Sequence, residues 1–334
     1  MHVLVAVRHP EHVRFYRHAV TELRERGHRV SILARAHAAT VALLDRYDLP
    51  YAVLAGEPST TADLVAGHVR YEARTLARAV RTDADVLTSV GGRAVSHLAP
   101  LAGARSVVFV DWAPTRVDRI VARLADAVCT PAYLAGAFGD RQVVYDGLHE
   151  LAYLDPERDG RPDPPPDLPP EPYAVVGVRD PAAAGAWYGP VRDRLARHGG
   201  VALVSASGTD DDVDRRYAAD GAVEGVLAGA TACVSALGTT ATEAAVCGTP
   251  TVFVGDPPVR CRHLRDEYDL VATADAATAT DRVEEVLADG SAGNRWARRR
   301  RRLLDDTDNV TDAVVAAVLG DRGPADRGRV HPGG

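Results

Sequence analysis

The chain has 334 residues, of which 46% are hydrophobic and 25% are charged. This length favours two domains over one, and the lack of any run of 18 apolar residues excludes a predicted transmembrane helix. The formal net charge of −7 weighs against a nucleic-acid partner, because binding to a phosphate backbone draws on basic surface.

The first half of the sequence alternates short β-rich runs with helical patterns. It opens on residues 2–7, which we predict to be a strand and not a signal peptide, because no basic segment or cleavage site accompanies them. A long polar helix is predicted over residues 59–81. The other predicted strands of this half are 29–35, 51–55, 85–90, 106–111, 127–131 and 143–147. Such alternation indicates a parallel sheet covered by helices on both faces.

A segment rich in proline and charge, residues 155–172, marks a predicted stiff linker. Beyond it the alternation resumes, with predicted strands at 173–178, 201–206, 232–237, 251–254 and 270–274 and a last apolar helix at 313–319. The tail 321–334 carries no core residues and is expected to be disordered. The predicted fold class is therefore α/β, with two Rossmann-like βαβ domains, residues 1–154 and 173–320, that face a cleft.

Ligands of open α/β sheets bind beyond the carboxyl ends of the strands, and one such end stands out in the second domain. A strand stops at Gly238, Thr239 and Thr240 follow, and a helix carries Glu243 about one turn in. A threonine can cap this helix, its first N–H groups can bind phosphate, and Glu243 is spaced for ribose hydroxyls. The alternative is a well-capped turn with an acid in its first helical turn.

The segment from Ser235 to Pro258 resembles the donor-site signature of GT-B glycosyltransferases of the MurG type and of the sugar-nucleotide 2-epimerases. The matching residues are Ser235, Gly238, Glu243, Gly248, Pro250, Pro257 and Pro258. The chain is also similar over nearly its whole length to an archaeal family of unassigned function in the GT-B superfamily. That similarity rests on His9-Pro10-x-His12, on residues 125–131 and on the segment from Gly147 through Glu150 to Pro156.

The resemblance implies a GT-B fold, with a nucleotide-sugar donor in the C-terminal domain and an acceptor in the N-terminal domain. For the donor we assign Arg179, which follows strand 173–178, together with Ser235, Gly238, Thr239, Thr240 and Glu243. For the acceptor, or for a hinge, we assign Gly91, Gly92, Arg93 and Glu150. We expect no cofactor and no metal, because no histidine or cysteine cluster has metal-ligand spacing and no P-loop is present.

Three residues after strands are candidates for a catalytic base: His9, His12 and Asp111. Histidine is the natural general base near neutral pH, and a strand-terminal acid can act as a base or bind a sugar. Alternatively, these side chains only cap helices or hydrogen-bond loops.

The run Arg298–Arg302 suggests a peripheral membrane contact or, alternatively, a solvated helix face neutralised by Asp305, Asp306 and Asp308. The four cysteines show no CxxC spacing and are expected to be reduced residues of a cytoplasmic protein.

The leading hypothesis is a metal-independent glycosyltransferase that uses a nucleotide-diphosphate sugar, expected to be a UDP-sugar, and an unknown acceptor. A second is a non-hydrolysing sugar-nucleotide 2-epimerase. Its family carries a histidine motif where this chain has Arg179-Asp180-Pro181 and a pair of glutamates where this chain has Glu243 alone. The third is a nucleotide-sugar binder without catalysis.

Overall fold

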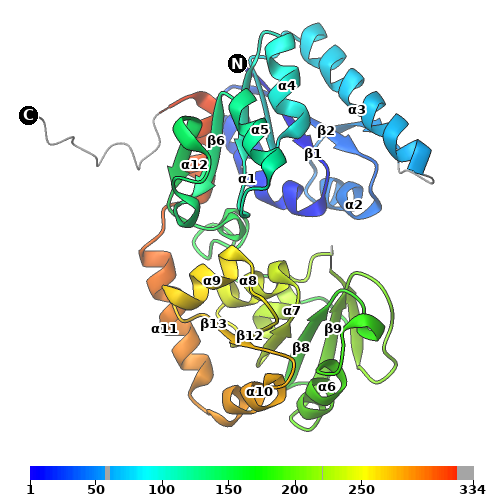
Figure 1. Cartoon of the computed structure of the whole chain (residues 1–334), viewed down its shortest axis with the longest axis vertical. Coiled ribbons are helices and arrows are strands. Elements are labelled where there is room, and N and C mark those ends of the chain that lie inside the picture. The colour runs from blue at the N-terminus through cyan, green and yellow to red at the C-terminus, as the bar shows by residue number, and fades with distance from the viewer. Residues whose placement is uncertain (57–60, 220, 322–334) are drawn as a thin grey trace, which may run out of the picture. The chain divides into compact units, whose positions relative to one another are not determined.

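The computed structural model describes residues 1–56, 61–219 and 221–321. These residues form two units, of which unit 1 comprises Met1–Tyr153 and the chain from Asp308 onward and unit 2 comprises Leu154–Thr307. Both are layered α/β structures (Figure 1). Most of the tail predicted at 321–334 lies outside the described residues.

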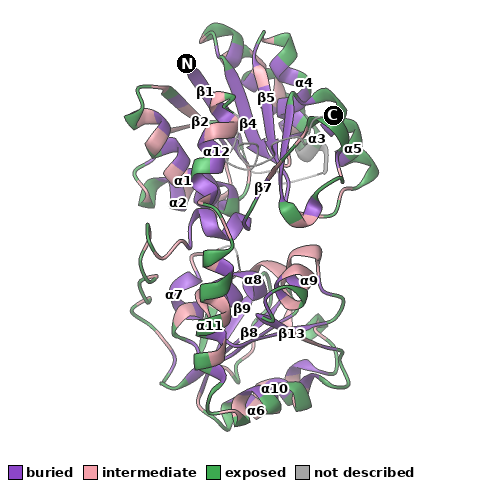
Figure 2. Ribbon diagram, turned by 90° about the vertical axis from the view of Figure 1, so that its left-hand side faces the viewer, coloured by how far each residue is buried: buried purple, intermediate pink, exposed green. Residues whose placement is uncertain are grey.

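Unit 1 is built on a seven-stranded parallel sheet with the order β3-β2-β1-β4-β5-β6-β7. Its strands are β1 (His2–Val7), β2 (Arg29–Arg35), β3 (Tyr51–Ala55), β4 (Val86–Val90), β5 (Arg105–Phe109), β6 (Ala127–Pro131) and β7 (Gln142–Tyr145). Every residue of β1 and β4 is buried, as expected for a sheet with both faces covered (Figure 2). The order reverses between β1 and β4, which are direct neighbours. This switch point is where open α/β sheets bind ligands.

The helices of unit 1 come from both ends of the chain. They are α1 (Pro10–Glu25), α2 (Ala38–Arg46), α3 (Thr61–Arg81), α4 (Arg93–Leu101), α5 (Arg116–Leu124) and α12 (Val310–Leu319). The sequence places the chain up to residue 320 in the C-terminal domain, whereas in the structure α12 packs against α1 in unit 1. The cause is tertiary: α12 buries Val314 and Val318, and the Arg105 guanidinium donates to its final carbonyls, at 2.9 Å for Ala317.

Unit 2 holds a six-stranded parallel sheet with the order β10-β9-β8-β11-β12-β13. The strands are β8 (Tyr173–Val178), β9 (Gly200–Ser205), β10 (Arg215–Ala218), β11 (Cys233–Ser235), β12 (Thr251–Val254) and β13 (Val271–Ala274). The helices are α6 (Tyr188–Ala196), α7 (Glu224–Gly229), α8 (Gly238–Cys247), α9 (Val259–Asp266), α10 (Ala279–Ala288) and α11 (Ala292–Asp305). Here the order reverses between β8 and β11, so these two strands form the switch point of unit 2.

The proline-rich segment 155–172 contains no helix or strand, as predicted, but it packs along unit 2. The Asp167 carbonyl accepts a hydrogen bond of 2.9 Å from the Tyr217 hydroxyl, and the Ala228 carbonyl accepts one of 3.1 Å from Arg161. Leu168 lies against the core of the unit. The segment is thus anchored to one domain along much of its length.

The arginine run of α11 forms ion pairs and hydrogen bonds within unit 2. Arg299 pairs with Asp269 and lies over the Trp296 ring, and Arg302 lies 3.6 Å from Asp306. Arg300 donates to the Val246 carbonyl. Of the three acids expected to neutralise the run, Asp306 does so, and Asp269, from the loop between α9 and β13, also pairs with it. Across residues 1–56, 61–219 and 221–321 no helix is both long and apolar enough to cross a bilayer.

Candidate functional site

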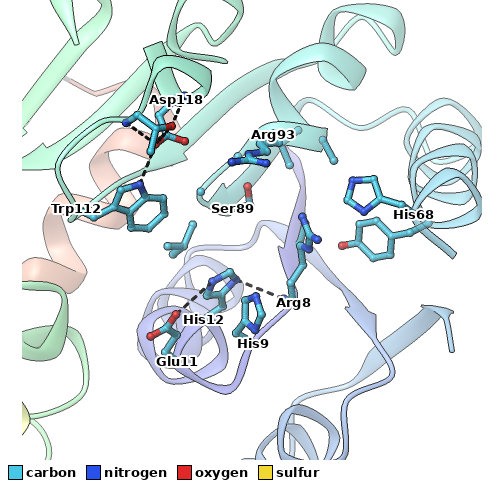
Figure 3. A pocket seen from close by; sticks show the side chains of 17 residues that line it. Arg8, His9, Glu11, His12, His68, Ser89, Arg93, Trp112 and Asp118 are labelled. Atoms are coloured by element: carbon cyan, nitrogen blue, oxygen red, sulfur yellow. Dashed lines mark hydrogen bonds and ion pairs between the residues drawn. The ribbon is translucent and has the colours of Figure 1, made fainter. Parts of the chain in front are cut away.

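A cavity of about 430 Å³ opens at the switch point of unit 1 (Figure 3). It lies at the carboxyl ends of β1 and β4, with α1, α3, α4 and the loop after β5 around it. Five residues assigned from the sequence line this cavity: His9, His12, Gly91, Gly92 and Arg93. We refer to it below as the unit 1 pocket.

The two glycines shape the wall of this pocket. Gly92 has φ +33°, and a Cβ there would lie 2.3 Å from the Val108 side chain. Gly91 has φ +76°, and its Cβ would lie 3.0 Å from the Trp112 ring. Glycine is therefore required for the turn to pack against β5, and this packing starts α4 at Arg93 on the edge of the pocket.

His12 is nearly buried, and its ring is neutral. Its Nδ1 accepts a hydrogen bond of 3.4 Å from the Arg8 backbone N–H, and its Nε2 lies 3.9 Å from a Glu11 carboxylate oxygen. Burial, with the nearby His9 and Arg8 charges, lowers the pKa of His12 to about 3. In this tautomer the proton is on Nε2, which makes His12 less suited than His9 to the predicted role of base.

His9 is better placed to accept a proton. It is exposed at the N-cap of α1, yet its side chain makes no capping hydrogen bond. Its ring meets the His12 ring edge-on, with centroids 5.3 Å apart. Partial removal from water, followed by the charges of Arg8 and His37, lowers its pKa. A neutral, exposed imidazole at the pocket can act as a general base.

Two assigned residues lie outside the pocket lining. Asp111 is 6% exposed, and its Oδ1 lies 3.8 Å from Nδ1 of His149, whose ring packs on Phe15 at 4.4 Å. Glu150 is 2% exposed on the short 3₁₀ helix His149–Ala152, which packs on α1 close to the unit boundary at Tyr153. Both acids are buried, so a ligand cannot contact them directly in this structure.

In unit 2 the corner between β11 and α8 differs in detail from the sequence interpretation. The helix begins at Gly238, and its N-cap is Leu237, which makes no side-chain capping bond. A threonine cap was predicted, but Thr239 and Thr240 lie within the first turn. Ser235 is fully buried and accepts from the Leu237 N–H at 2.9 Å, so its hydroxyl holds the turn.

Arg260 on α9 reaches the start of α8. Its Nη2 donates a hydrogen bond of 2.9 Å to the Thr239 hydroxyl. A Cβ on Gly238 would lie 2.7 Å from Pro258, so glycine is needed here for close packing of the chain that leads into α9. Among the described residues, the N–H groups of Gly238, Thr239 and Thr240 have no hydrogen-bond acceptor. Uncapped N–H groups, the helix dipole and a guanidinium together make an anion site.

The other two donor-site assignments have opposite surroundings. Arg179 is exposed at the end of β8, and because β8 neighbours β11 it shares a sheet edge with the corner. Glu243 is 1% exposed, because α7, α9 and α11 pack around α8. The sequence predicts that Glu243 contacts the ribose. In this structure its side chain is too deeply buried for a ligand to reach it.

No protein-family model matches the chain, and no curated protein matches its sequence. Solved structures do resemble it. MurG of Acinetobacter baumannii is 14% identical with a TM-score of 0.58, over 96% of this chain and 99% of MurG. The spinosyn rhamnosyltransferase SpnG, complexed with thymidine diphosphate, is 14% identical with a TM-score of 0.62, over 96% and 100%. A Listeria monocytogenes protein described as a UDP-N-acetylglucosamine 2-epimerase is 13% identical with a TM-score of 0.70, over 96% of each chain.

The fold is GT-B. The two parallel sheets of seven and six strands alternate with helices as in these neighbours, and the predicted fold class is confirmed. At this level of identity the likeness concerns architecture, and a GT-B fold supports more than one chemistry. The chemistry must therefore be argued from the residues at the two switch points.

Sequence reasoning missed several residues at these GT-B switch points. Asp118 lines the pocket and forms a capping box with Thr115, a signal readable from Thr-x-x-Asp. His68 and Trp112 also line it, but no local pattern marks them, since only the topology brings α3 and the loop after β5 to β1. Arg260 follows the Pro-Pro pair and carries no signature either. The described residues contain no group of three or more His, Cys, Asp or Glu side chains placed to hold a metal ion.

Proposed function

We propose that the protein binds a nucleotide-diphosphate sugar at the corner between β11 and α8 and transfers the sugar to an acceptor held in the unit 1 pocket. The main support for this proposal is the hydrogen bond that the Arg260 guanidinium donates to the Thr239 hydroxyl at the start of α8. A helix N-terminus carries partial positive charge and disfavours a cation by about 0.3–1 kcal/mol. A diphosphate bound at this point would accept hydrogen bonds from the N–H groups of the helix start and would lie beside the Arg260 guanidinium.

The proposed chemistry is independent of a metal ion. Charge that develops on the departing diphosphate would be stabilised by the N–H groups of Gly238 to Thr240 and by Arg260. Arg179, exposed at the same sheet edge, would bind the remainder of the phosphate chain. His9 would accept the proton of the acceptor hydroxyl as that oxygen bonds to the anomeric carbon. That SpnG, a GT-B neighbour, holds thymidine diphosphate supports a nucleotide ligand of this kind, and a UDP-sugar is our expected donor.

Nucleotide-sugar binding without turnover is the second candidate. Burial of Asp111 and the donor tautomer of His12 favour it, because they leave His9 as the one assigned base that faces the pocket with an accessible ring. A 2-epimerase is less well supported. Its family's paired glutamates are represented by Glu243 alone, and this residue is closed to solvent.

The decisive test measures the binding of UDP-, dTDP-, GDP- and CDP-sugars by thermal shift and by isothermal titration calorimetry. The variant is Arg260→Ala, and the matched control is Arg265→Ala. Arg265 lies on the same helix and pairs with Asp266 instead of the corner. Binding of one nucleotide by the wild type and the control, lost in Arg260→Ala, would support the proposal. No binding of any nucleotide by the wild type would end both enzyme hypotheses.

A further inference from the structure

Two arginines that line the unit 1 pocket, Arg8 and Arg93, have no ion-pair or hydrogen-bond partner for their guanidinium groups within the described part of the chain. Arg8, Arg93 and His68 surround one side of the pocket, and in Figure 3 the Arg8 side chain extends towards Arg93 and His68.

A third arginine adds positive charge close to Arg8 and Arg93. Arg35, at the end of β2, lies beside α3, with its Nη2 3.2 Å from where a Cβ of Gly67 would be. Its Nε and Nη2 are buried without a hydrogen-bond partner among the described residues. Burial, together with the charges of Arg35 and Arg93, lowers the pKa of Arg8. Unpaired guanidinium groups this close repel one another, and a bound anion would remove that cost.

The nearby carboxylates interact with other groups and not with the two guanidinium groups. Asp118 Oδ2 accepts from the Thr115 N–H at 2.9 Å, the Thr115 hydroxyl at 2.7 Å and Trp112 Nε1 at 3.2 Å. Glu72 lies 3.4 Å from both His68 and His97. Glu11 lies beside His12, with 49% of its side chain exposed.

Backbone donors point to the same kind of ligand. The N–H groups of Arg93, Ala94 and Val95 begin α4, and no acceptor for them is found among the described residues. Ala94 and Val95 line the pocket. A helix start beside two guanidinium groups can bind an oxyanion from two directions.

We infer that the unit 1 pocket binds the phosphate or carboxylate group of an acidic organic ligand. Arg8, Arg93, His68 and the start of α4 hold the oxyanion, and the organic part fills the rest of the cavity beside Trp112. Naming this ligand the acceptor of sugar transfer rests on the proposed function, whereas its negative charge follows from the pocket alone.

The test titrates the full-length protein, without nucleotide and at low chloride, with three small probes. Phenyl phosphate and phenylacetate carry the two oxyanions, and benzyl alcohol is the neutral control. Tryptophan fluorescence reports binding, and Trp112→Phe identifies the signal of the pocket, since Trp187 and Trp296 belong to unit 2. The variants are Arg8→Gln and Arg93→Gln. Arg70→Gln is the control, because Arg70 is exposed on α3 and does not line the pocket.

We expect one or both anions to bind at least about tenfold more tightly than benzyl alcohol, and to lose about tenfold or more in affinity in Arg8→Gln or Arg93→Gln, as for charged hydrogen bonds. Arg70→Gln should change affinity by less than about twofold. The tighter anion identifies a phosphate-bearing or a carboxylate-bearing ligand. Equal binding of benzyl alcohol, or anion binding unchanged in both pocket variants, would overturn the inference, as would no binding of either anion.

Two further readouts keep the result interpretable. Sodium chloride should weaken anion binding to the wild type, which requires no variant to fold, and Arg93→Lys should retain part of the affinity because it keeps the charge. Nucleotide-sugar binding is measured separately, on the wild type and on Arg260→Ala. A protein that binds phenyl phosphate but no nucleotide sugar would refute the proposed function and leave the anion site standing.

Discussion

The backbone N–H of Arg8 donates to Nδ1 of His12, and this contact fixes a neutral ring inside unit 1. Because the folded pKa of His12 is lowered from 6.5 to about 3, the unfolded chain takes up a proton in this range that the folded protein does not. Stability is therefore complete above pH 6.5 and falls as the pH drops towards 3, by up to about 1.4 kcal/mol per pH unit from this residue.

The measurement is urea unfolding of wild type and His12→Asn between pH 4 and pH 8. The variant should show a shallower loss of stability on acidification, because its side chain does not titrate. Parallel curves for the two proteins would contradict the assignment of a buried neutral His12.

Catalysis should depend on His9 more than on His12. Once a donor and an acceptor are known, His9→Gln should lower kcat by about 10²–10⁴-fold with little change in KM, as expected for loss of a general base. His12→Asn, whose amide oxygen can replace Nδ1 as the acceptor of the Arg8 N–H, should have a much smaller effect on kcat. Steady-state kinetics on both variants decides, and a larger loss for His12→Asn would transfer the role of base to that residue.

The Thr239 hydroxyl should matter as an anchor for Arg260. Thr239→Val removes the acceptor of the 2.9 Å bond and should weaken nucleotide binding by up to about tenfold, the worth of one hydrogen bond. Thr239→Ser keeps the hydroxyl and should bind like the wild type. Calorimetric titration with the preferred nucleotide compares the three proteins. Equal affinity in Thr239→Val would separate Thr239 from the phosphate site.

The close packing of Gly92 on Val108 should dominate the cost of adding a side chain. Gly92→Ala introduces a Cβ 2.3 Å from Val108 at φ +33°, and we expect a loss of about 2–4 kcal/mol. Gly103→Ala is a suitable control, because Gly103 also has positive φ (+70°) but no atom within 4 Å of its Cβ, so only about 1 kcal/mol is expected. Val108→Ala should recover part of the loss in Gly92→Ala. Chemical denaturation measures each term, and equal losses at both glycines would mean that backbone strain alone accounts for the effect.

The strands and the parallel sheets could be predicted because buried parallel strands appear as short apolar runs between helices. Residues 215–218 escaped prediction, since the edge strand β10 has the sequence Arg-Arg-Tyr-Ala and buries none of these residues. The location of the unit 1 pocket was also predictable, because residues after β1 and β4 meet wherever these strands are neighbours.

Features that depend on packing between distant segments could not be predicted from the sequence. The burial of Glu243 follows from the helices around α8, and the charge of the unit 1 pocket needs α3 and the end of β2 beside β1. The spacing of Thr239 and Thr240 also fits a cap, but α8 begins one residue before Thr239, because Ser235 already holds the preceding turn.

The return of α12 to unit 1 makes that unit discontinuous in sequence, with unit 2 inserted between its two parts. During synthesis, unit 2 is therefore completed from one uninterrupted segment. In unit 1, α1 can pack against α12 only after more than 280 further residues have been synthesised. A fragment that ends at residue 153 would expose the apolar surface that α12 covers, but residues 154–307 can be expressed as one continuous piece. Unit 2, where we propose that the nucleotide sugar binds, is thus the unit that is encoded by one continuous segment and can be tested for binding in isolation.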